Sequence, residues 1–265
     1  MADFPQLSTG AVSQYPLTRN VVTRTVTNSL EDGSTIRLAD PVYKIRWDLS
    51  YTGLSQNEWN ALAAFFASMQ GQLNTFIFVD PAANLLSWSE DLSQTVWVKD
   101  GLIQTTAGIA DPLQGTSATL VTNTAQIAQG VSQQINAPGS YSYCFSVYLR
   151  CDQACSVTLR CFANGVEQDE QDLIDSEWSR YTLSVALSSP IEGVTFGLLF
   201  PAGVAVDVFG LQVEAQPAAG IYKKVTGAGA VYVHSRFAQD ELPFSIDSFG
   251  LYSAKFSILT NILPA

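Results

Sequence analysis

Histidine is almost absent from this sequence, since His234 is the only one in 265 residues. A serine hydrolase triad would have to use this one residue, and no G-x-S-x-G segment occurs to hold the nucleophile. The glycine-rich residues 227–230 lack the third glycine and the strand-to-helix setting of a dinucleotide-binding loop, and no phosphate-binding loop is present. These absences argue against the common hydrolase and nucleotide-binding enzymes, and we do not expect an enzyme.

Cysteine is also scarce, and all four cysteines fall between positions 144 and 161 without a C-x-x-C pair. Because His234 is far away in the sequence, this spacing does not predict a zinc site. Cys151, Cys155 and Cys161 share the parity of neighbouring apolar residues, so we expect buried free thiols. A Cys151–Cys155 or Cys144–Cys161 disulfide is the alternative in oxidising surroundings.

Charged residues make up only 14% of the chain, whereas 47% of the residues are apolar. No apolar run approaches the roughly 20 residues that a membrane-spanning helix needs, so we expect a soluble, ordered protein with no membrane partner. The first ten residues lack the basic and apolar regions of a secretory signal, which predicts synthesis without translocation. The net charge of −11 disfavours nucleic-acid binding, because phosphate contacts require clustered lysine and arginine.

Residues 55–71 (SQNEWNALAAFFASMQG) are the one segment typical of a long amphipathic helix. Ser55 and Glu58 have the spacing of a capping box, and Gly71 is the expected left-handed stop. Apolar residues recur at steps of three and four, which predicts that one face packs in the core of the domain. The residues that we expect in this core are Trp59, Leu62, Phe66 and Met69.

Strands are expected on both sides of this helix. Apolar and polar residues alternate over residues 43–51, and residues 75–79 (TFIFV) are rich in β-forming side chains. A strand over residues 253–263 is expected to complete the same sheet beside the helix. Together they predict an α+β domain.

The N-terminal residues 4–27 mix proline, glycine and β-branched residues and predict an extended arm that leads into a strand. Such an arm either fills a groove of its own domain or lies across a neighbouring molecule. Residues 31–34 contain an Asp-Gly turn, after which residues 35–38 pair back as a hairpin.

Between residues 83 and 223 the helical periodicity disappears and the pattern predicts an all-β jelly roll. This stretch carries 14 acidic and 5 basic residues, whereas the two flanks together are close to neutral, so it behaves as a separate unit. Similar Pro-Ala-Ala breaks at 81–83 and 217–219 mark its ends.

We therefore predict a mainly β chain, with residues 1–82 and 224–265 forming a discontinuous α+β domain, a β-sandwich plus one helix, around an inserted domain of residues 83–223. The expected strands of the insertion are 101–105, 117–121, 125–131, 141–150, 156–162, 179–187, 194–200 and 206–213.

The outer segments resemble the distal tail proteins of siphophage-like bacteriophages and prophages. The resemblance is carried by the opening FPQLSTGAVSQYPLTR, by residues 47–81 with their aromatic strand, L-S-x-x-E helix start and F-x-F-x-D-P strand, and by the closing strand. It implies a structural virion protein of the baseplate at the tail tip, made in the bacterial cytoplasm. It further implies a homo-hexameric ring whose partners are a tail tube protein and a baseplate hub protein.

The inserted stretch resembles the carbohydrate-binding jelly-roll modules of phage tail and appendage proteins. The carriers are the segments that begin at Asn84 (NLLSWSEDLSQTVWVKDGL), Tyr141 (YSYCFSVYLRC), Trp178 (WSRYTLSV) and Val206 (VDVFGLQVEAQPAAGIY). The resemblance implies a module that contacts host-surface glycans. An alternative makes this adhesin role the main function, with the flanks as an anchor, and a third possibility is an enzyme acting on surface polysaccharide.

Aromatic faces stack on sugar rings, and Tyr148, Arg150 and Trp178 are our candidates for glycan contact because Tyr148 has outward parity beside Arg150. Six carboxylates between Glu167 and Glu177 are interpreted as a solvated loop rather than as a glycosidase pair, which would have to face across a cleft. No cofactor is expected. A structural calcium ion is the one alternative, with candidate ligands Glu90, Asp91, Asp207 and Glu214.

Overall fold

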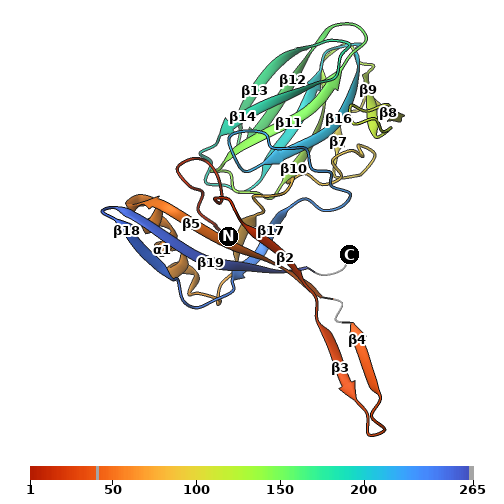
Figure 1. The fold of residues 1–265 in the computed structure, drawn as a ribbon. Coiled ribbons are helices and arrows are strands. Elements are labelled where there is room, and N and C mark those ends of the chain that lie inside the picture. The colour runs from red at the N-terminus through yellow and green to blue at the C-terminus, as the bar shows by residue number, and fades with distance from the viewer. Residues whose placement is uncertain (40–41, 263–265) are drawn as a thin grey trace. The chain divides into compact units, whose positions relative to one another are not determined.

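The computed structural model describes residues 1–39 and 42–262, and this part of the chain contains four sheets and a single helix (Figure 1). The chain divides into two compact units. Unit 1 comprises residues 1–8, 13–78 and 232–265, and unit 2 comprises residues 9–12 and 79–231. The predicted fold class, mainly β with one helix and an all-β sandwich, is confirmed. None of the described helices is long and apolar enough to span a membrane.

Unit 1 is built on one seven-stranded sheet. Its two longest strands, β5 (Tyr43–Ser55) and β19 (Leu251–Ile262), run antiparallel from Tyr43 opposite Ile262 to Ser55 opposite Leu251. The final strand therefore lies beside β5 as the sequence predicts, although the predicted last residue, Leu263, lies outside the described residues. The other strands of the sheet are β1 (Ala2–Asp3), β2 (Thr18–Val22), β6 (Phe76–Val79), β17 (Val231–Phe237) and β18 (Phe244–Ser248).

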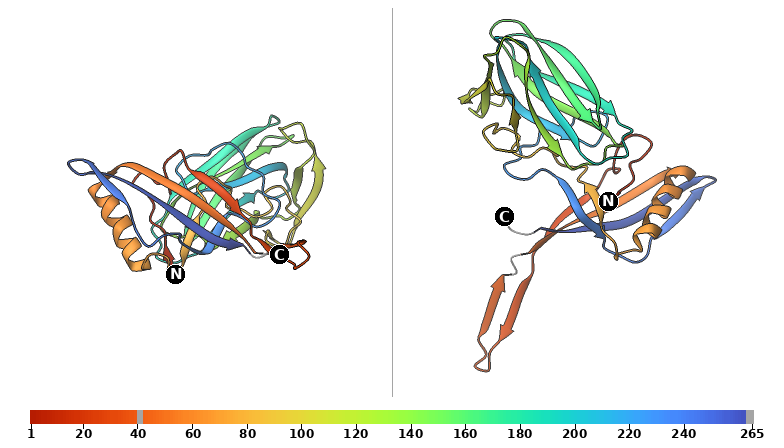
Figure 2. Two further views of the ribbon diagram at one scale, coloured as in Figure 1. Left: turned by 60° about the horizontal axis from the view of Figure 1, so that its bottom comes forward. Right: turned by 180° about the vertical axis from the view of Figure 1, so that it is seen from behind.

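Helix α1 (Gln56–Met69) follows β5 directly and packs on β5 and β19 (Figures 1 and 2). Its N-terminus has the predicted capping box: the amide of Glu58 donates to the Ser55 hydroxyl, and the amide of Ser55 donates to the Glu58 carboxylate. The left-handed stop begins one residue earlier than predicted, at Gln70 with φ 53°. Gly71 follows with φ 62°, and a Cβ there would lie 2.6 Å from Oδ1 of Asp240, so only glycine fits.

The core of unit 1 is aromatic. Phe4 from the N-terminal arm is buried, so this part of the arm fills its own domain. Its ring packs against Phe65, Phe76, Phe78, Phe237 and Phe256.

Of the predicted core residues on the helix, Leu62 and Met69 are buried. Trp59 and Phe66 are only partly buried. The Trp59 ring stacks on Phe244 and Tyr252, with ring centroids 4.5 and 5.7 Å away.

The predicted hairpin forms from β3 (Thr25–Ser29) and β4 (Thr35–Ala39). Asp32 accepts a hydrogen bond from the amide of Ser34, and Gly33 has φ 81°, which explains the Asp-Gly signal at the turn. Among the described residues these two strands pair only with each other.

Unit 2 is a sandwich of two five-stranded antiparallel sheets. Phe145 and Tyr143 of one sheet pack on Phe196 of the other, with ring centroids 5.9 and 5.7 Å apart, and all three are fully buried. In spatial order the first sheet contains β13 (Val166–Ile174), β12 (Cys155–Ala163), β15 (Val194–Phe200), β10 (Gln129–Ile135) and β7 (Val98–Lys99). The second contains β14 (Ser179–Ala186), β11 (Ser142–Arg150), β16 (Ala205–Glu214), β9 (Ala118–Asn123) and β8 (Ile103–Ile109).

The acidic run that begins at Glu167 corrects one expectation, because most of it is strand and not loop. Residues Val166–Ile174 form β13, the edge strand paired with β12 along its whole length. Asn164 and Gly165 join the two strands with φ 48° and 80°, as in the two-residue turns that match the twist of a hairpin. The carboxylates are tolerated because an edge strand leaves most of its side chains in water.

Candidate functional site

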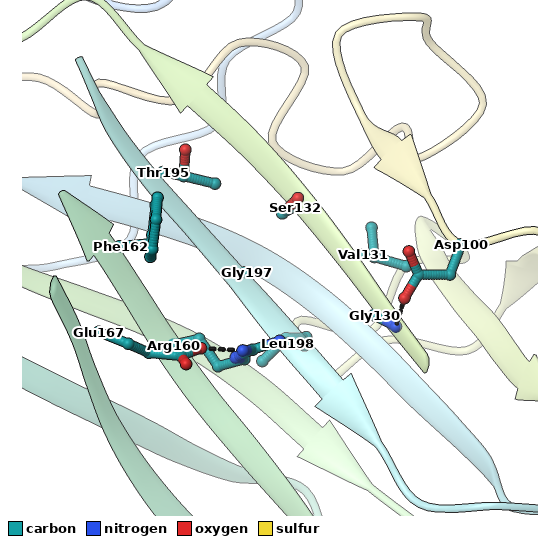
Figure 3. A pocket seen from close by; sticks show the side chains of 10 residues that line it. All are labelled: Asp100, Gly130, Val131, Ser132, Arg160, Phe162, Glu167, Thr195, Gly197 and Leu198. Carbon is teal, nitrogen blue, oxygen red and sulfur yellow. Dashed lines mark hydrogen bonds and ion pairs between the residues drawn. The ribbon is translucent and has the colours of Figure 1, made fainter. Parts of the chain in front are cut away.

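A groove of about 240 Å³ lies on the outer face of the first sheet of unit 2 (Figure 3). Strand pairing explains its position. Arg160 of β12 and Ser132 of β10 both lie opposite Gly197 of β15, which forms one row across three strands. Phe162 lies opposite Thr195 in the neighbouring row, so side chains of the two rows point out of the same face.

Gly197 makes the base of the groove. A Cβ at this position would lie 2.5 Å from the carbonyl oxygen of Val131 and 2.7 Å from Cβ of Ser132, closer than real Cβ atoms approach. The middle of the row therefore has no side chain, and the side chains of Arg160 and Ser132 line the hollow on its two flanks.

A charged cluster forms one side of the groove. The guanidinium of Arg160 makes an ion pair with Glu167, and its Nε lies 3.8 Å from Oδ1 of Asp169. Both carboxylates come from β13, on which Asp169 lies opposite Arg160 and Glu167 lies opposite Phe162. The Nε atom of Arg160 is buried and has no hydrogen-bond partner among the described residues, so it keeps the capacity to donate.

Phe162 supplies an apolar face beside this cluster, and 46% of its surface is exposed. The hydroxyls of Ser132 and Thr195 and the carboxylate of Asp100 also line the groove. Asp100 is held at the rim by the amide of Gly130, which donates to its Oδ2 at 2.7 Å (Figure 3). The groove thus combines one exposed ring with hydrogen-bond donors and acceptors.

The aromatic and basic residues singled out in the sequence, Tyr148, Arg150 and Trp178, lie on the second sheet and its edge, outside this groove. Tyr148 has the outward parity that was predicted, since the buried Val147 and Leu149 flank it on β11. The guanidinium of Arg150 lies over the Trp178 ring at 4.9 Å and pairs with Asp207 at 2.8 Å.

Residues 216–225, the covering segment, lie across the outer face of this second sheet. Arg180 of β14 donates to the carbonyl of Gly220 at 2.6 Å, and its guanidinium also lies 5.4 Å from the centre of the Tyr148 ring. Ser184 donates to the carbonyl of Pro217, and Gln212 bonds the backbone of Ile221 and Lys223. This segment therefore covers part of that face, whereas Arg150 and Asp207 line an open hollow of about 380 Å³ at one end of the sheet.

The carboxylates considered for calcium each have a protein partner. Glu90 pairs with Lys224, Glu214 with Lys223, and Asp207 with Arg150. Asp91 instead accepts hydrogen bonds from the turn that follows it. Within residues 1–39 and 42–262, no group of three histidine, cysteine or acidic side chains is arranged to hold a metal ion.

The main groove residues, Phe162, Arg160 and Gly197, were not among the candidates taken from the sequence. The signal that could have revealed two of them was the Asn164-Gly165 turn, which requires a hairpin and thereby places Phe162 and Arg160 on a strand next to the acidic residues.

No protein-family model matches this chain, and no curated protein matches it. In contrast, solved structures are similar to about half of the chain. The CBM22-1 xylan-binding domain of Paenibacillus barcinonensis Xyn10C is 15% identical over 51% of this chain and 96% of that domain, with a TM-score of 0.41. TmCBM61, solved in complex with β-1,4-galactotriose, is 13% identical over 50% of this chain and 98% of that one, with a TM-score of 0.39.

A viral structure is also similar. The enzymatically active domain of bacteriophage CBA120 tailspike protein 4 is 10% identical, with a TM-score of 0.39, and the match covers 51% of this chain and 22% of that one. About half of this chain thus resembles carbohydrate-binding jelly-roll modules, and the likeness is one of fold.

Proposed function

We propose that unit 2 is a non-catalytic module that binds a neutral glycan chain in the groove lined by Phe162, Arg160, Ser132 and Thr195. The observation that carries this proposal is the exposed ring of Phe162 beside a fixed Arg160–Glu167 ion pair. An aromatic face packs against the apolar face of a sugar ring, while charged and hydroxyl groups bond its hydroxyls. All of these groups stand on strands, which hold them in place without a ligand.

The dimensions of the groove favour part of a polymer. Pockets that enclose a drug-sized ligand have volumes of about 300–1,000 Å³, and this groove, at about 240 Å³, is smaller. It would take one or two sugar rings of a chain that continues past the rim.

The charge of the groove favours a neutral ligand. Arg160 is its one basic residue, whereas Asp100 and Glu167 line it and Asp169 lies beside it. Unit 2 as a whole is strongly acidic, so a uronic or sialic acid polymer would be repelled on approach.

Binding of the full chain to a glycan array, followed by titration calorimetry with the best ligand, tests this proposal. Phe162→Ala should weaken binding by about 1–2 kcal/mol, a loss of roughly five- to thirty-fold. Leu173→Ala is the matched control, because Leu173 is an exposed apolar residue on the same sheet and does not line the groove. If Trp178→Ala weakened glycan binding by this amount and Phe162→Ala had no effect, the ligand would instead be assigned to the second sheet.

We further propose that unit 1 assembles into a ring of copies at a bacteriophage tail tip, between a tail tube protein and a baseplate hub protein. The support is a pair of different apolar surfaces on this unit. The β3–β4 hairpin exposes Ile36 and Leu38, and the β18–β19 hairpin exposes Ile246 and Phe249. Contacts between two unlike surfaces of identical copies close into a ring when the rotation permits.

The edge strand β2 adds to this argument. Among the described strands it pairs only with β5, and Val21 and Val22 are exposed on it. Such an edge offers unpaired backbone groups to a strand of another copy. Electron microscopy and light scattering of the purified full chain test the proposal: closed rings of uniform mass are expected, and a monomer at micromolar concentration would contradict it.

A further inference from the structure

Two cysteine thiols meet at one corner of the unit 2 sandwich. Cys151 directly follows β11, Cys155 begins β12, and three residues turn between them. The two Sγ atoms are 3.1 Å apart, and the Cys155 thiol donates to the Cys151 sulfur. Among the described residues, no such sulfur contact involves Cys144 or Cys161, which are buried elsewhere.

This corner joins the two sheets twice. The turn between Cys151 and Cys155 crosses from the second sheet to the first, and the link through Asp175 crosses back from β13 to β14. The amide of Cys151 donates to the carbonyl of Asp175 at 2.7 Å, and Cys155 lies opposite Ile174 in the ladder. The thiol pair therefore lies where both links are already held together by backbone hydrogen bonds.

We propose that Cys151 and Cys155 are a modification site at which an intramolecular disulfide forms when the protein meets an oxidising thiol–disulfide couple. A disulfide requires its sulfur atoms to be about 2.05 Å apart, so each must move by only about half an ångström. The bridge would fix the turn that joins the two sheets.

The reaction needs a low-molecular-weight disulfide such as oxidised glutathione as the oxidant. The thiolate of Cys155 attacks one sulfur of that reagent, which forms a mixed disulfide and releases one reduced thiolate. The thiolate of Cys151 then attacks the Cys155 sulfur and expels the second. Two protein thiols are thereby oxidised to one disulfide, and one glutathione disulfide is reduced to two thiols.

Access gives the two residues different roles. Both cysteines line, with Asp152 and Gly203, an open hollow of about 380 Å³. Cys151 is only 5% exposed, whereas Cys155 is partly exposed, so the reagent reaches the Cys155 sulfur more readily. Burial and the neighbouring Cys151 raise the pKa of the Cys155 thiol, so little thiolate is present at neutral pH. The exchange should therefore be slow in both directions, as suits a structural bridge rather than a catalytic one.

Equilibration of the full chain with reduced and oxidised glutathione tests the proposal. In oxidised samples the thiol count after denaturation should fall from four to two, and peptide mapping should show Cys151 joined to Cys155. The melting temperature of the transition that unfolds unit 2 should rise on the order of 5 °C, because a cross-link over five residues constrains the unfolded chain only modestly.

Cys155→Ser should abolish both changes, whereas Cys144→Ala should keep the bridge and lose one unrelated thiol. The mapping of the wild-type chain does not depend on how either variant folds. Four thiols remaining after full equilibration would overturn the proposal, as would a bridge between Cys144 and Cys161 or a glutathione adduct that never resolves into a protein disulfide.

Discussion

Arg160 on β12 lies directly opposite Gly197 on β15, so a long basic side chain faces a strand position that carries no side chain at all. Around this pair, Glu167 fixes the guanidinium and Phe162 supplies the exposed ring. A side chain at 197 would meet Val131 and Ser132 of β10, so glycine at this position keeps the base of the groove open between Ser132 and Arg160.

Gly197→Ala is expected to close the groove and to strain the sheet. The added methyl would lie 2.5 Å from the Val131 carbonyl oxygen, so β10 must move, at a cost of about 1–3 kcal/mol in the free energy of unfolding. Glycan binding should be lost in the same variant. Gly101→Ala is the control, since a Cβ at Gly101 meets no atom within 4 Å, and chemical denaturation with calorimetric titration measures both effects.

Replacing Arg160 should weaken glycan binding. Without this residue, the two β13 carboxylates should oppose binding instead of supporting it. In Arg160→Gln, Glu167 and Asp169 lose their counter-charge and repel each other along β13 on one side of the groove, so affinity should fall by about ten-fold or more. The double variant Arg160→Gln, Glu167→Gln should recover part of the loss, because it removes the uncompensated charge. Equal affinity of the single and double variants would show that the ion pair does not position the ligand.

Local signals predicted much of unit 1. The Ser55–Glu58 spacing is a property of four consecutive residues, and the alternation along β5 reflects one buried face, so neither depends on distant parts of the chain. The end of the helix at Gln70 was missed because the glycine signal belongs to the next residue. Gly71 is a glycine because Asp240 approaches it closely, and Asp240 is 169 positions away in the C-terminal segment of the unit.

The groove could not be predicted in the same way, because its side chains come from β10, β12, β13 and β15 and meet only through strand order. The parity of Tyr148 was predicted correctly, yet parity alone does not show that Arg180 and the covering segment lie on that face. In the sequence, the acidic residues of β13 indicate a solvated loop, whereas Asn164-Gly165 indicates a hairpin turn. The loop was the interpretation chosen, so Glu167 was not predicted to lie beside Phe162.

Unit 1 should lose stability in acid through Glu58. Burial alone would raise the pKa of this carboxyl, but hydrogen bonds from Ser8 and Ser55 outweigh it and lower the pKa to about 2. Since the unfolded carboxyl titrates near about 4.3, the stabilisation is present above that pH and is lost as the pH falls towards 2.

Glu58→Gln should therefore be less stable than the wild type at neutral pH, by about 1 kcal/mol for the weakened cap, and should lose less stability between pH 5 and pH 2. Denaturant unfolding followed at a series of pH values measures this difference. Glu241→Gln, at an exposed carboxyl of the same unit, is the control, and parallel pH profiles for wild type and Glu58→Gln would contradict the assignment.

The two faces of the β3–β4 hairpin provide a test of assembly. Strand pairing sets Leu38 opposite Val26 and Ile36 opposite Asn28, so these side chains share one face, whereas Arg37 and Thr27 share the other. A two-stranded hairpin is at best marginally stable alone in water, and its apolar face gains stability when another copy covers it.

Leu38→Asp should therefore abolish rings of the full chain while leaving its folding intact, because Leu38 is 53% exposed and makes no contribution to either buried core. Thr27→Asp places the same charge on the opposite face of the same hairpin and should still assemble. Light scattering gives the mass of each variant, and the circular dichroism melt of each confirms the fold. Rings of wild-type mass in Leu38→Asp would exclude the apolar face of the hairpin as a contact between copies, whereas loss of assembly in both variants would show that charge on the hairpin, and not burial of Leu38, controls association.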